Sequence, residues 1–289
     1  MLDWQLNNRA DKNINLSNFS INLPTNQNQL FMPQVSSEPR QDIRLAANLI
    51  KKSRHVVVLT GAGISTPSGI PDFRSAGSGL WTRYDPMEVA SLRAFRYNPE
   101  KFFAWLRGLV INMAEAEPNA AHIALARLER AGHVQVIITQ NIDELHHRAG
   151  SENVLEVHGS MRTLTCISCY QKYNSGDFVK SYLENGEIPR CPDCGNVLKP
   201  DVVLFEEQLP FKTWLQAQAQ ASNCDLMIIC GSSLEVMPVA GLPVKALENN
   251  AHLIVVNETL TYIDERADIV FRDDVAELIP SIAAEVIRE

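Results

Sequence analysis

The segment HVVVLTGAGISTPSGIPDFRS, residues 55–75, joins an apolar run to a glycine-rich turn. A β-branched run of this kind favours an interior strand of a parallel sheet, covered on both faces. Directly after the strand come Gly61, Ala62 and Gly63, and glycine lets backbone N–H groups approach a diphosphate closely. The segment therefore predicts an α/β fold with a cofactor-binding turn at the end of a buried strand.

The turn differs from the dinucleotide-binding fingerprint of dehydrogenases. It lacks the third glycine, and Pro67 and Pro71 interrupt the helix that would follow. A tight turn closed by an Asp–Arg ion pair is one interpretation of what comes next. The other is a loop that brings a carboxylate, an aromatic ring and a guanidinium to the diphosphate: Asp72, Phe73 and Arg74.

Composition narrows the classes of protein. The chain has 289 residues and a net charge of −8, which argues against sequence-independent binding of nucleic acid. No apolar stretch approaches the roughly 18 residues of a membrane helix. The amino terminus also lacks a basic segment followed by an apolar one. We expect a cytoplasmic protein without membrane contact, and the sequence does not indicate its oligomeric state.

The first part of the chain predicts an extension and a helix. Residues 1–40 are rich in asparagine and have too few apolar side chains to fold alone, so we expect a flexible extension. A strap that lies on the domain through residues 30–32 is the alternative. Apolar residues then recur at helical spacing over residues 41–52, which predicts a helix packed on the first strand.

Helical patterns follow the glycine turn. Gly77 and Gly79 mark a flexible segment, which Leu80, Trp81 and Tyr84 follow, and this segment could form a moving cofactor lid that contains Trp81. The spacing of apolar residues predicts helices between residues 87 and 113 and over residues 120–131. A second buried strand is expected over residues 134–139.

Polar side chains follow this second strand directly: Gln140, Asn141, Ile142 and Asp143 form the segment QNID. Open parallel sheets bind ligands at the carboxyl ends of their strands, which makes the segment a candidate for the site. The alternative is that Asn141 or Asp143 only caps the next helix.

His158 follows a short apolar run, residues 154–157, and precedes a glycine. An imidazole at a strand end has a pKa near 6.5 and can accept a proton at neutral pH. A lone histidine is more often structural, so its role depends on the neighbouring motifs.

Four cysteines form two CxxC pairs that are 21 residues apart. Each pair supplies two thiolates from one tight turn, as tetrahedral zinc sites require, and four thiolates leave no open position for catalysis. We therefore predict a structural Zn²⁺ site; two redox-active pairs are the alternative. The ligands would be Cys166, Cys169, Cys191 and Cys194.

Two further strand ends complete the predicted site. The strand at residues 226–230 leads into Gly231, Ser232 and Ser233, whose small side chains and N–H groups could hold a phosphate or ribose. The strand at residues 253–256 ends at Asn257, which could bind a ribose hydroxyl or the adenine edge.

Taken in order, GAGIS, GIPDFRS, TQNIDELH, HGS, the CxxC pairs, GSSLEV and VNE resemble the sirtuin family of NAD-dependent protein deacylases. The resemblance covers residues 41–289. It implies a Rossmann-like parallel sheet domain made from residues 41–75, 118–160 and 200–289. It also implies an inserted small domain, with a helical module at residues 76–117 and a zinc-ribbon module at residues 161–199.

The resemblance further implies an enzyme that transfers the acyl group of a modified lysine to ADP-ribose and releases nicotinamide. His158 matches the general base, and Asn141 with Asp143 would hold the carboxamide and ribose of NAD. The partner is then an acylated lysine in a protein or peptide. Mono-ADP-ribosyl transfer or NAD hydrolysis is the alternative activity, and a catalytically idle NAD or ADP-ribose sensor is a second one.

Two positions depart from patterns in the family. Leu106 and Leu109 align with the tyrosine and arginine of the desuccinylating branch, so we expect neutral acyl groups to be preferred. Glu206 stands where many relatives have glycine, and its charge could affect the residues that flank the substrate lysine.

Overall fold

The computed structural model describes residues 40–74, 77 and 79–288, so the predicted extension lies outside the described residues except for its last one. Six strands form one sheet in the order β3-β2-β1-β7-β8-β9, and every neighbouring pair is parallel. This confirms the predicted α/β class. The strands are β1 (Val56–Thr60), β2 (Val136–Thr139), β3 (Val154–Glu156), β7 (Leu226–Cys230), β8 (His252–Val256) and β9 (Ile269–Phe271).

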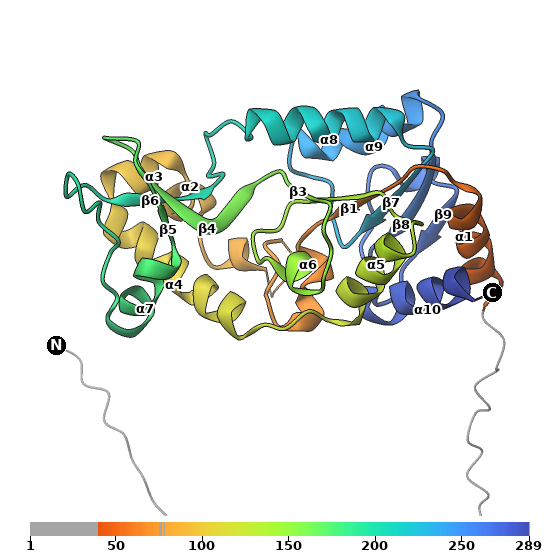
Figure 1. Cartoon of the computed structure of the whole chain (residues 1–289), viewed down its shortest axis with the longest axis horizontal. Coiled ribbons are helices and arrows are strands. Elements are labelled where there is room, and N and C mark those ends of the chain that lie inside the picture. Colours follow the sequence, from red (N-terminus) through yellow and green to blue (C-terminus); the bar gives the residue numbers. More distant parts are fainter. Residues whose placement is uncertain (1–39, 75–76, 78, 289) are drawn as a thin grey trace, which may run out of the picture. The chain divides into compact units, whose positions relative to one another are not determined.

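The valine run forms β1, which is buried on both faces. Val56 and Val58 point into the core below α1, α5 and α10, whereas Val57 and Leu59 point into the core below α8 and α9. A strand between two helical layers has no polar face, which explains its continuous hydrophobicity. Figure 1 shows α8 and α9 along one face of the sheet and α5 and α10 along the other. The helices are α1 (Gln41–Lys52), α5 (Ala120–Arg130), α8 (Phe211–Asn223), α9 (Leu242–Glu248) and α10 (Val275–Ile287).

The strand order reverses at β1. The chain passes from β1 to β2 on one side, and later returns to β7 on the other side of β1. Loops that leave such neighbouring strands in opposite directions open a crevice, and open α/β sheets bind ligands there. The predicted site segments after β1, β2 and β7 therefore meet at one edge of the sheet.

The chain leaves this edge after β1 in short turns instead of one helix, as Pro67 and Pro71 predicted. The helical pattern beyond them forms three helices. Ser91 and Asn98 interrupt it, because each side chain caps a new helix by accepting a backbone N–H. The elements are η1 (Ala62–Ile64), η2 (Thr66–Ser68), η3 (Leu80–Thr82), α2 (Pro86–Val89), α3 (Leu92–Tyr97) and α4 (Pro99–Glu115).

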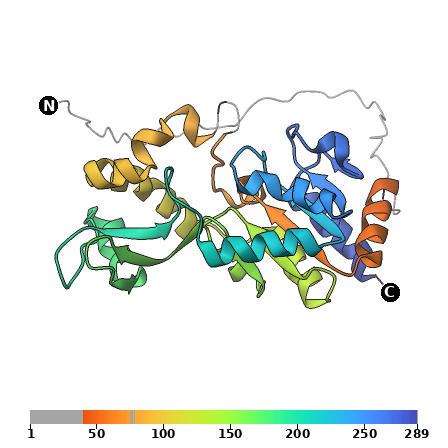
Figure 2. The ribbon, with the colours of Figure 1, turned by 90° about the horizontal axis from the view of Figure 1, so that it is seen from above.

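A second insertion follows β3 and contains both cysteine pairs. It consists of β4 (Gly159–Cys166), β5 (Lys172–Asn174), α7 (Gly176–Asn185) and β6 (Leu198–Val202), with an antiparallel sheet in the order β5-β4-β6. Figure 2 shows its green strands beside the yellow helices of the first insertion. The two insertions share an apolar core, where the rings of Phe103 and Tyr182 lie 5.5 Å apart. The residue ranges given above for the two domains stay a prediction.

Among the described residues, none of the helices combines the length and the apolar character needed to cross a bilayer.

Candidate active site

A pocket of about 1050 Å³ lies at the carboxyl edge of the parallel sheet and reaches into the apolar core of the insertions. Every predicted cofactor or catalytic residue lines it, so residues from distant parts of the sequence meet in one place. Which of them contact NAD stays a prediction. They are Gly61, Ala62, Gly63, Asp72, Phe73, Arg74, Trp81, Gln140, Asn141, Ile142, Asp143, His158, Gly231, Ser232, Ser233 and Asn257.

The glycines after β1 and β7 lie against each other. Gly61 N donates to Cys230 O at 3.1 Å, and Gly63 N donates to Gly231 O at 2.8 Å. A Cβ on Gly63 would lie 2.9 Å from the Cα of Gly231, which itself has a φ of +60°. The N–H groups of Gly61 and Gly63 are therefore used within the protein, and the approach of other backbone N–H groups of this turn to a diphosphate stays a prediction. Glycine is required there because the backbones of the two loops are in contact.

Asn141 presents one polar atom to the pocket. Its Nδ2 group donates to Gly61 O at 3.0 Å and to Ser65 Oγ at 3.1 Å, which uses both amide hydrogens. The side-chain oxygen is left as the group that can meet a ligand. The amide is held by the glycine turn of β1, so its orientation depends on that turn.

Asp143 is buried and connected to the same turn. Ser65 Oγ donates to Asp143 Oδ2 at 2.6 Å, and Leu145 N donates to Oδ1 at 2.9 Å, at the start of α6 (Leu145–Arg148). Burial raises the pKa of Asp143, whereas both hydrogen bonds act in the opposite direction. Asp143 therefore lines the pocket and also accepts an N–H at the helix start, which were alternatives in the sequence.

Ser65 was not predicted as a functional residue. It belongs to the GAGIS motif, which could have indicated it, but its partner Asp143 is 78 residues away in the sequence. Its hydroxyl joins Asn141 to Asp143, so one serine orients both side chains.

His158 lies beside Gln140, with its Nδ1 atom 3.0 Å from Gln140 O. A carbonyl oxygen only accepts, so Nδ1 carries the hydrogen and the lone pair is on Nε2. Burial lowers the pKa of His158, and the nearby charge of Arg74 acts in the same direction. The neutral imidazole can therefore accept a proton at Nε2 near pH 7.

Polar groups at the other strand ends connect the loops. Gln140 Nε2 donates to Ser232 Oγ at 2.8 Å, which joins the loops after β2 and β7. Asn257, at the end of β8, donates through Nδ2 to Thr259 O at 2.9 Å. Arg74 Nε lies 3.1 Å from Glu235 Oε2, so the guanidinium pairs with the loop after β7.

Aromatic and aliphatic side chains form the rest of the pocket wall. The ring of Trp81 lies 5.1 Å from Phe73 and 5.9 Å from Trp105, between centroids. Leu106 and Leu109 of α4 are buried and line the deeper part. This part of the pocket has the apolar surface that an aliphatic acyl group requires.

Glu206 has an exposed side chain and an unusual backbone, with a φ of +73° that favours glycine. Its carboxylate accepts the N–H of Arg93 at 3.1 Å, in the first turn of α3. One carboxylate oxygen is therefore bonded to the helical insertion. Its predicted effect on substrate residues stays a prediction.

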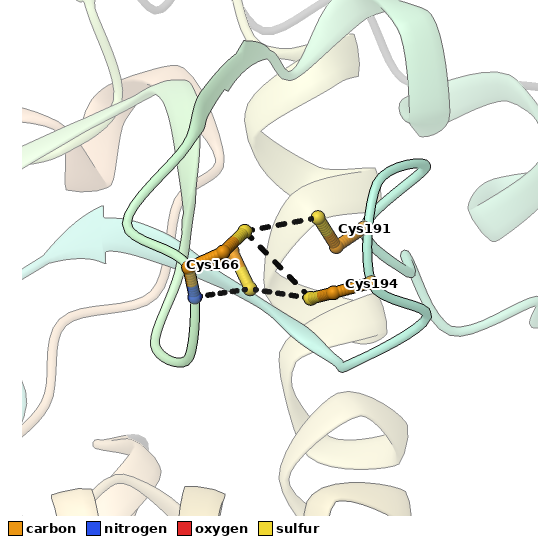
Figure 3. A group of neighbouring side chains, drawn as sticks. Cys166, Cys191 and Cys194 are labelled. Carbon is orange, nitrogen blue, oxygen red and sulfur yellow. Dashed lines mark hydrogen bonds between the residues drawn. The ribbon is translucent and has the colours of Figure 1, made fainter.

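The two cysteine pairs come together, and all four sulfur atoms lie within 4.8 Å of one another. Three of the Sγ–Sγ distances are 3.4, 3.5 and 3.6 Å. A zinc ion with Zn–S bonds of about 2.3 Å holds its sulfurs about 3.8 Å apart, so the cluster fits this metal. Figure 3 shows Cys191 and Cys194 turned towards the side that carries Cys166.

Comparisons with a family model and with curated proteins point to the same family. The family model described as Sir2 family matches residues 61–238. The chain is 48% identical to NAD-dependent protein deacylase 2 of Archaeoglobus fulgidus over 86% of its own length and 97% of that protein. It is 40% identical to the NAD-dependent protein deacetylase of Thermotoga maritima, over 82% of this chain and 96% of the relative.

The solved structures that resemble this chain belong to Sir2 proteins as well. A Sir2 enzyme solved for its mechanism and regulation superposes with a TM-score of 0.81 at 48% identity, covering 85% of this chain and 97% of that one. A Sir2 protein with a deacetylated p53 peptide and 3'-O-acetyl ADP-ribose has a TM-score of 0.79 at 38% identity, over 84% and 98%. Sir2Af2 bound to a myristoylated histone peptide has a TM-score of 0.73 at 42% identity, over 85% and 96%.

Proposed function

The chain belongs to the Sir2 family, and we propose that it is an NAD-dependent protein-lysine deacylase that transfers the acyl group to ADP-ribose and releases nicotinamide. The observation that carries this proposal is the meeting of a neutral His158 with Asn141 and Asp143 in one pocket. Binding of a nucleotide alone requires neither a base nor two polar side chains that Ser65 connects. The relatives named above carry NAD-dependent deacylase or deacetylase activity in their names.

The pocket residues fit NAD. Asn257 and the Ser232 segment offer hydrogen-bonding groups at the strand ends, and Arg74 offers a cation for the diphosphate. When bound, NAD supplies an electrophilic ribose carbon for the acyl-lysine oxygen. Asn141 and Asp143 would hold the nicotinamide end, and Phe73 and Trp81 would exclude water from it.

The role of His158 follows from its tautomer. Gln140 O fixes Nδ1–H, so the free Nε2 atom would accept a proton from a ribose hydroxyl, directly or through a neighbouring group. General-base assistance of this kind contributes roughly 100-fold to 10,000-fold in rate.

The acyl group would occupy the apolar part of the pocket. Leu106 and Leu109 offer aliphatic surface there, which suits acetyl and longer neutral chains. Solved Sir2 structures contain propionylated and myristoylated peptides, which is consistent with this substrate class. The substrate is then an acylated lysine in a protein or peptide.

One experiment tests the activity. The protein is incubated with NAD, with and without an acetyl-lysine peptide, and free nicotinamide and deacetylated peptide are measured. We expect both products, in equal amounts, only when peptide is present. Nicotinamide without peptide would instead favour NAD hydrolysis, and NAD binding without turnover would favour a sensor.

The residue assignment is tested with His158→Ala, which should bind NAD but lose at least about 100-fold in turnover. His133→Ala is the matched control, because His133 lies in the turn before β2 and does not line the pocket. An unchanged deacylation rate in His158→Ala would rule out the assignment.

The four cysteines would hold one structural zinc ion, which fills its coordination with thiolates and takes no part in the reaction. A cytoplasmic location and the lack of direct nucleic-acid binding belong to the same proposal, and rest on composition and charge.

A further inference from the structure

Three polar side chains form a buried hydrogen-bonded chain behind the pocket, at the ends of β1 and β2. Thr60 and Thr139 are paired residues of the two strands, and Thr60 Oγ1 donates to Thr139 Oγ1 at 2.9 Å. His146 of α6 places Nε2 3.0 Å from Thr60 Oγ1. These three residues are 0%, 3% and 2% exposed, so water does not compete for their hydrogen bonds.

The direction of the bonds follows from the number of hydrogens. Thr60 has one hydroxyl hydrogen, which it gives to Thr139, so the bond to His146 must be donated by Nε2–H. The imidazole then has its lone pair on Nδ1 and is neutral. Its ring lies 4.9 Å from the ring of His122, edge to face, and burial with two neighbouring histidines favours the neutral form.

This chain of hydrogen bonds ends at the backbone of Gln140 and Asn141, beside His158. Asn141 N donates to Thr139 Oγ1 at 3.1 Å, while Gln140 N donates to Thr60 O at 3.0 Å. The carbonyl of Gln140 in turn meets Nδ1 of His158. The peptide unit between Gln140 and Asn141 is therefore fixed on one side by the threonines and carries His158 on the other.

We propose that Thr139, held in place by Thr60 and His146, is a positioning residue that sets the orientation of Asn141 and His158 for the reaction. This inference rests on the proposed function of the same site. Thr139 does not line the pocket; it acts by fixing the backbone of residues that do. A neutral, hydrogen-bonded chain suits this task, because it holds geometry without adding a charge beside the base.

The test compares Thr139→Val with Thr139→Ser. Valine keeps the shape of the side chain and removes the acceptor of Asn141 N–H, whereas serine keeps the hydroxyl. We expect Thr139→Val to lower kcat about tenfold at saturating NAD and peptide, with an unchanged KM for peptide. Thr139→Ser should stay within about threefold of the parent. Ser151→Ala is the control, since it removes a buried hydroxyl outside this chain and should leave kcat unchanged.

A second measurement is independent of activity. Hydrogen exchange of the Asn141 backbone amide should be about tenfold faster in Thr139→Val than in Thr139→Ser, because only valine breaks its hydrogen bond. Equal kcat in the two variants, or losses that only follow the unfolded fraction in thermal melts, would overturn the inference. A parent protein with no deacylation would contradict the proposed function instead, and equal amide exchange would then still reject the positioning role.

Discussion

The carbonyl group of Gln140 decides what His158 can do. Because this oxygen accepts from Nδ1, the ring presents its basic nitrogen on the opposite side. The same residue bonds Ser232 through its side chain, so the base is connected to the loop after β7. The imidazole of His158 is thus oriented by the backbone of Gln140, a residue outside the HGS motif.

The first prediction concerns pH. A general base acts only when deprotonated, so kcat/KM should fall as the pH is lowered through the pKa of His158. Burial lowers this pKa from its ordinary value of 6.5, so the acid limb should have its midpoint below pH 6.5. The measurement is kcat/KM for NAD between pH 5 and 8. The limb should persist in His133→Ala, and a midpoint above 6.5 would contradict the assignment.

The second prediction concerns the acyl group. Leu106 and Leu109 provide no cation, and burying an unpaired carboxylate costs several kcal/mol, so acetyl-lysine should exceed succinyl-lysine in kcat/KM by about 100-fold or more. Competition between the two peptides measures the ratio.

A double variant should reverse this preference and serves as the control. Leu106→Tyr combined with Leu109→Arg introduces a hydroxyl and a guanidinium in the deep pocket, and should raise succinyl-lysine turnover while lowering that of acetyl-lysine. Equal efficiency of the parent on both peptides would show that these leucines do not select the acyl group.

The sequence indicated which residues line the pocket better than it indicated which residues contact one another there. The strand ends, the QNID segment and His158 were found because each follows an apolar run. Ser65 was missed as a site residue, and the contact of Gly61 and Gly63 with the loop after β7 was not foreseen, because both depend on distant segments. Composition and periodicity report local structure and do not show which loops touch.

In the insertion that carries the cysteine pairs, other side chains also contact the sulfur atoms. Tyr173 of β5 pairs with Leu164 of β4 and reaches across to the other cysteine turn, where its hydroxyl lies 3.2 Å from Cys191 Sγ. A zinc-bound thiolate has no hydrogen, so the tyrosine must donate. Asn196 Nδ2 bonds Cys194 Sγ in a similar way at 3.4 Å.

The third prediction is that Tyr173→Phe loses zinc faster than the parent. Removing an outer hydrogen bond to a metal ligand typically lowers metal affinity about 10-fold to 100-fold, and the effect should appear as faster transfer of zinc to a coloured chelator. Tyr170→Phe is the matched control, since Tyr170 is 79% exposed. Equal release rates in the two variants would exclude the contact as a stabiliser, and a parent without zinc would exclude the metal site.

Helices and strands with a strong pattern of apolar residues were predicted correctly, whereas a helix with a weak pattern was missed. Helix α1 and strand β7 have the predicted bounds, because α1 buries Ile43 and Ile50 at helical spacing and all five residues of β7 are buried. Helix α8 was not predicted; it buries only two alanines, Ala217 and Ala221, among glutamines. Its helical spacing is correct, but two methyl groups give little signal in the sequence.

Two histidines, His122 of α5 and His146 of α6, are buried in the part of the molecule that contains the parallel sheet. His122 of α5 is fully buried against His146, and the sequence interpretation did not assign it a role. Burial lowers the pKa of His122 to about 4, against 6.5 in an exposed histidine. His122 therefore binds a proton more weakly in the folded protein than in the unfolded chain.

The fourth prediction follows from this difference. Above pH 6.5 the histidine is neutral in both states and its contribution to stability is complete; as the pH falls towards 4, the unfolded state binds the proton first and stability is lost. For His122 the loss is about 2 kcal/mol between pH 7 and pH 5. His122→Gln should show a smaller decrease in the urea unfolding free energy over this range. The same decrease in both proteins would contradict the buried, neutral state.

The contact between Gly63 and Gly231 has a consequence for how the two loops can be re-engineered. A Cβ on Gly63 would lie 2.9 Å from the Cα of Gly231, and a Cβ on Gly231 would lie 2.3 Å from Ile64 N. Gly231 also has a φ of +60°, so a side chain there stays strained even when the loops move apart. The two positions are therefore coupled but unequal: alanine at Gly63 requires the loops to separate, whereas alanine at Gly231 requires separation and a new backbone conformation as well.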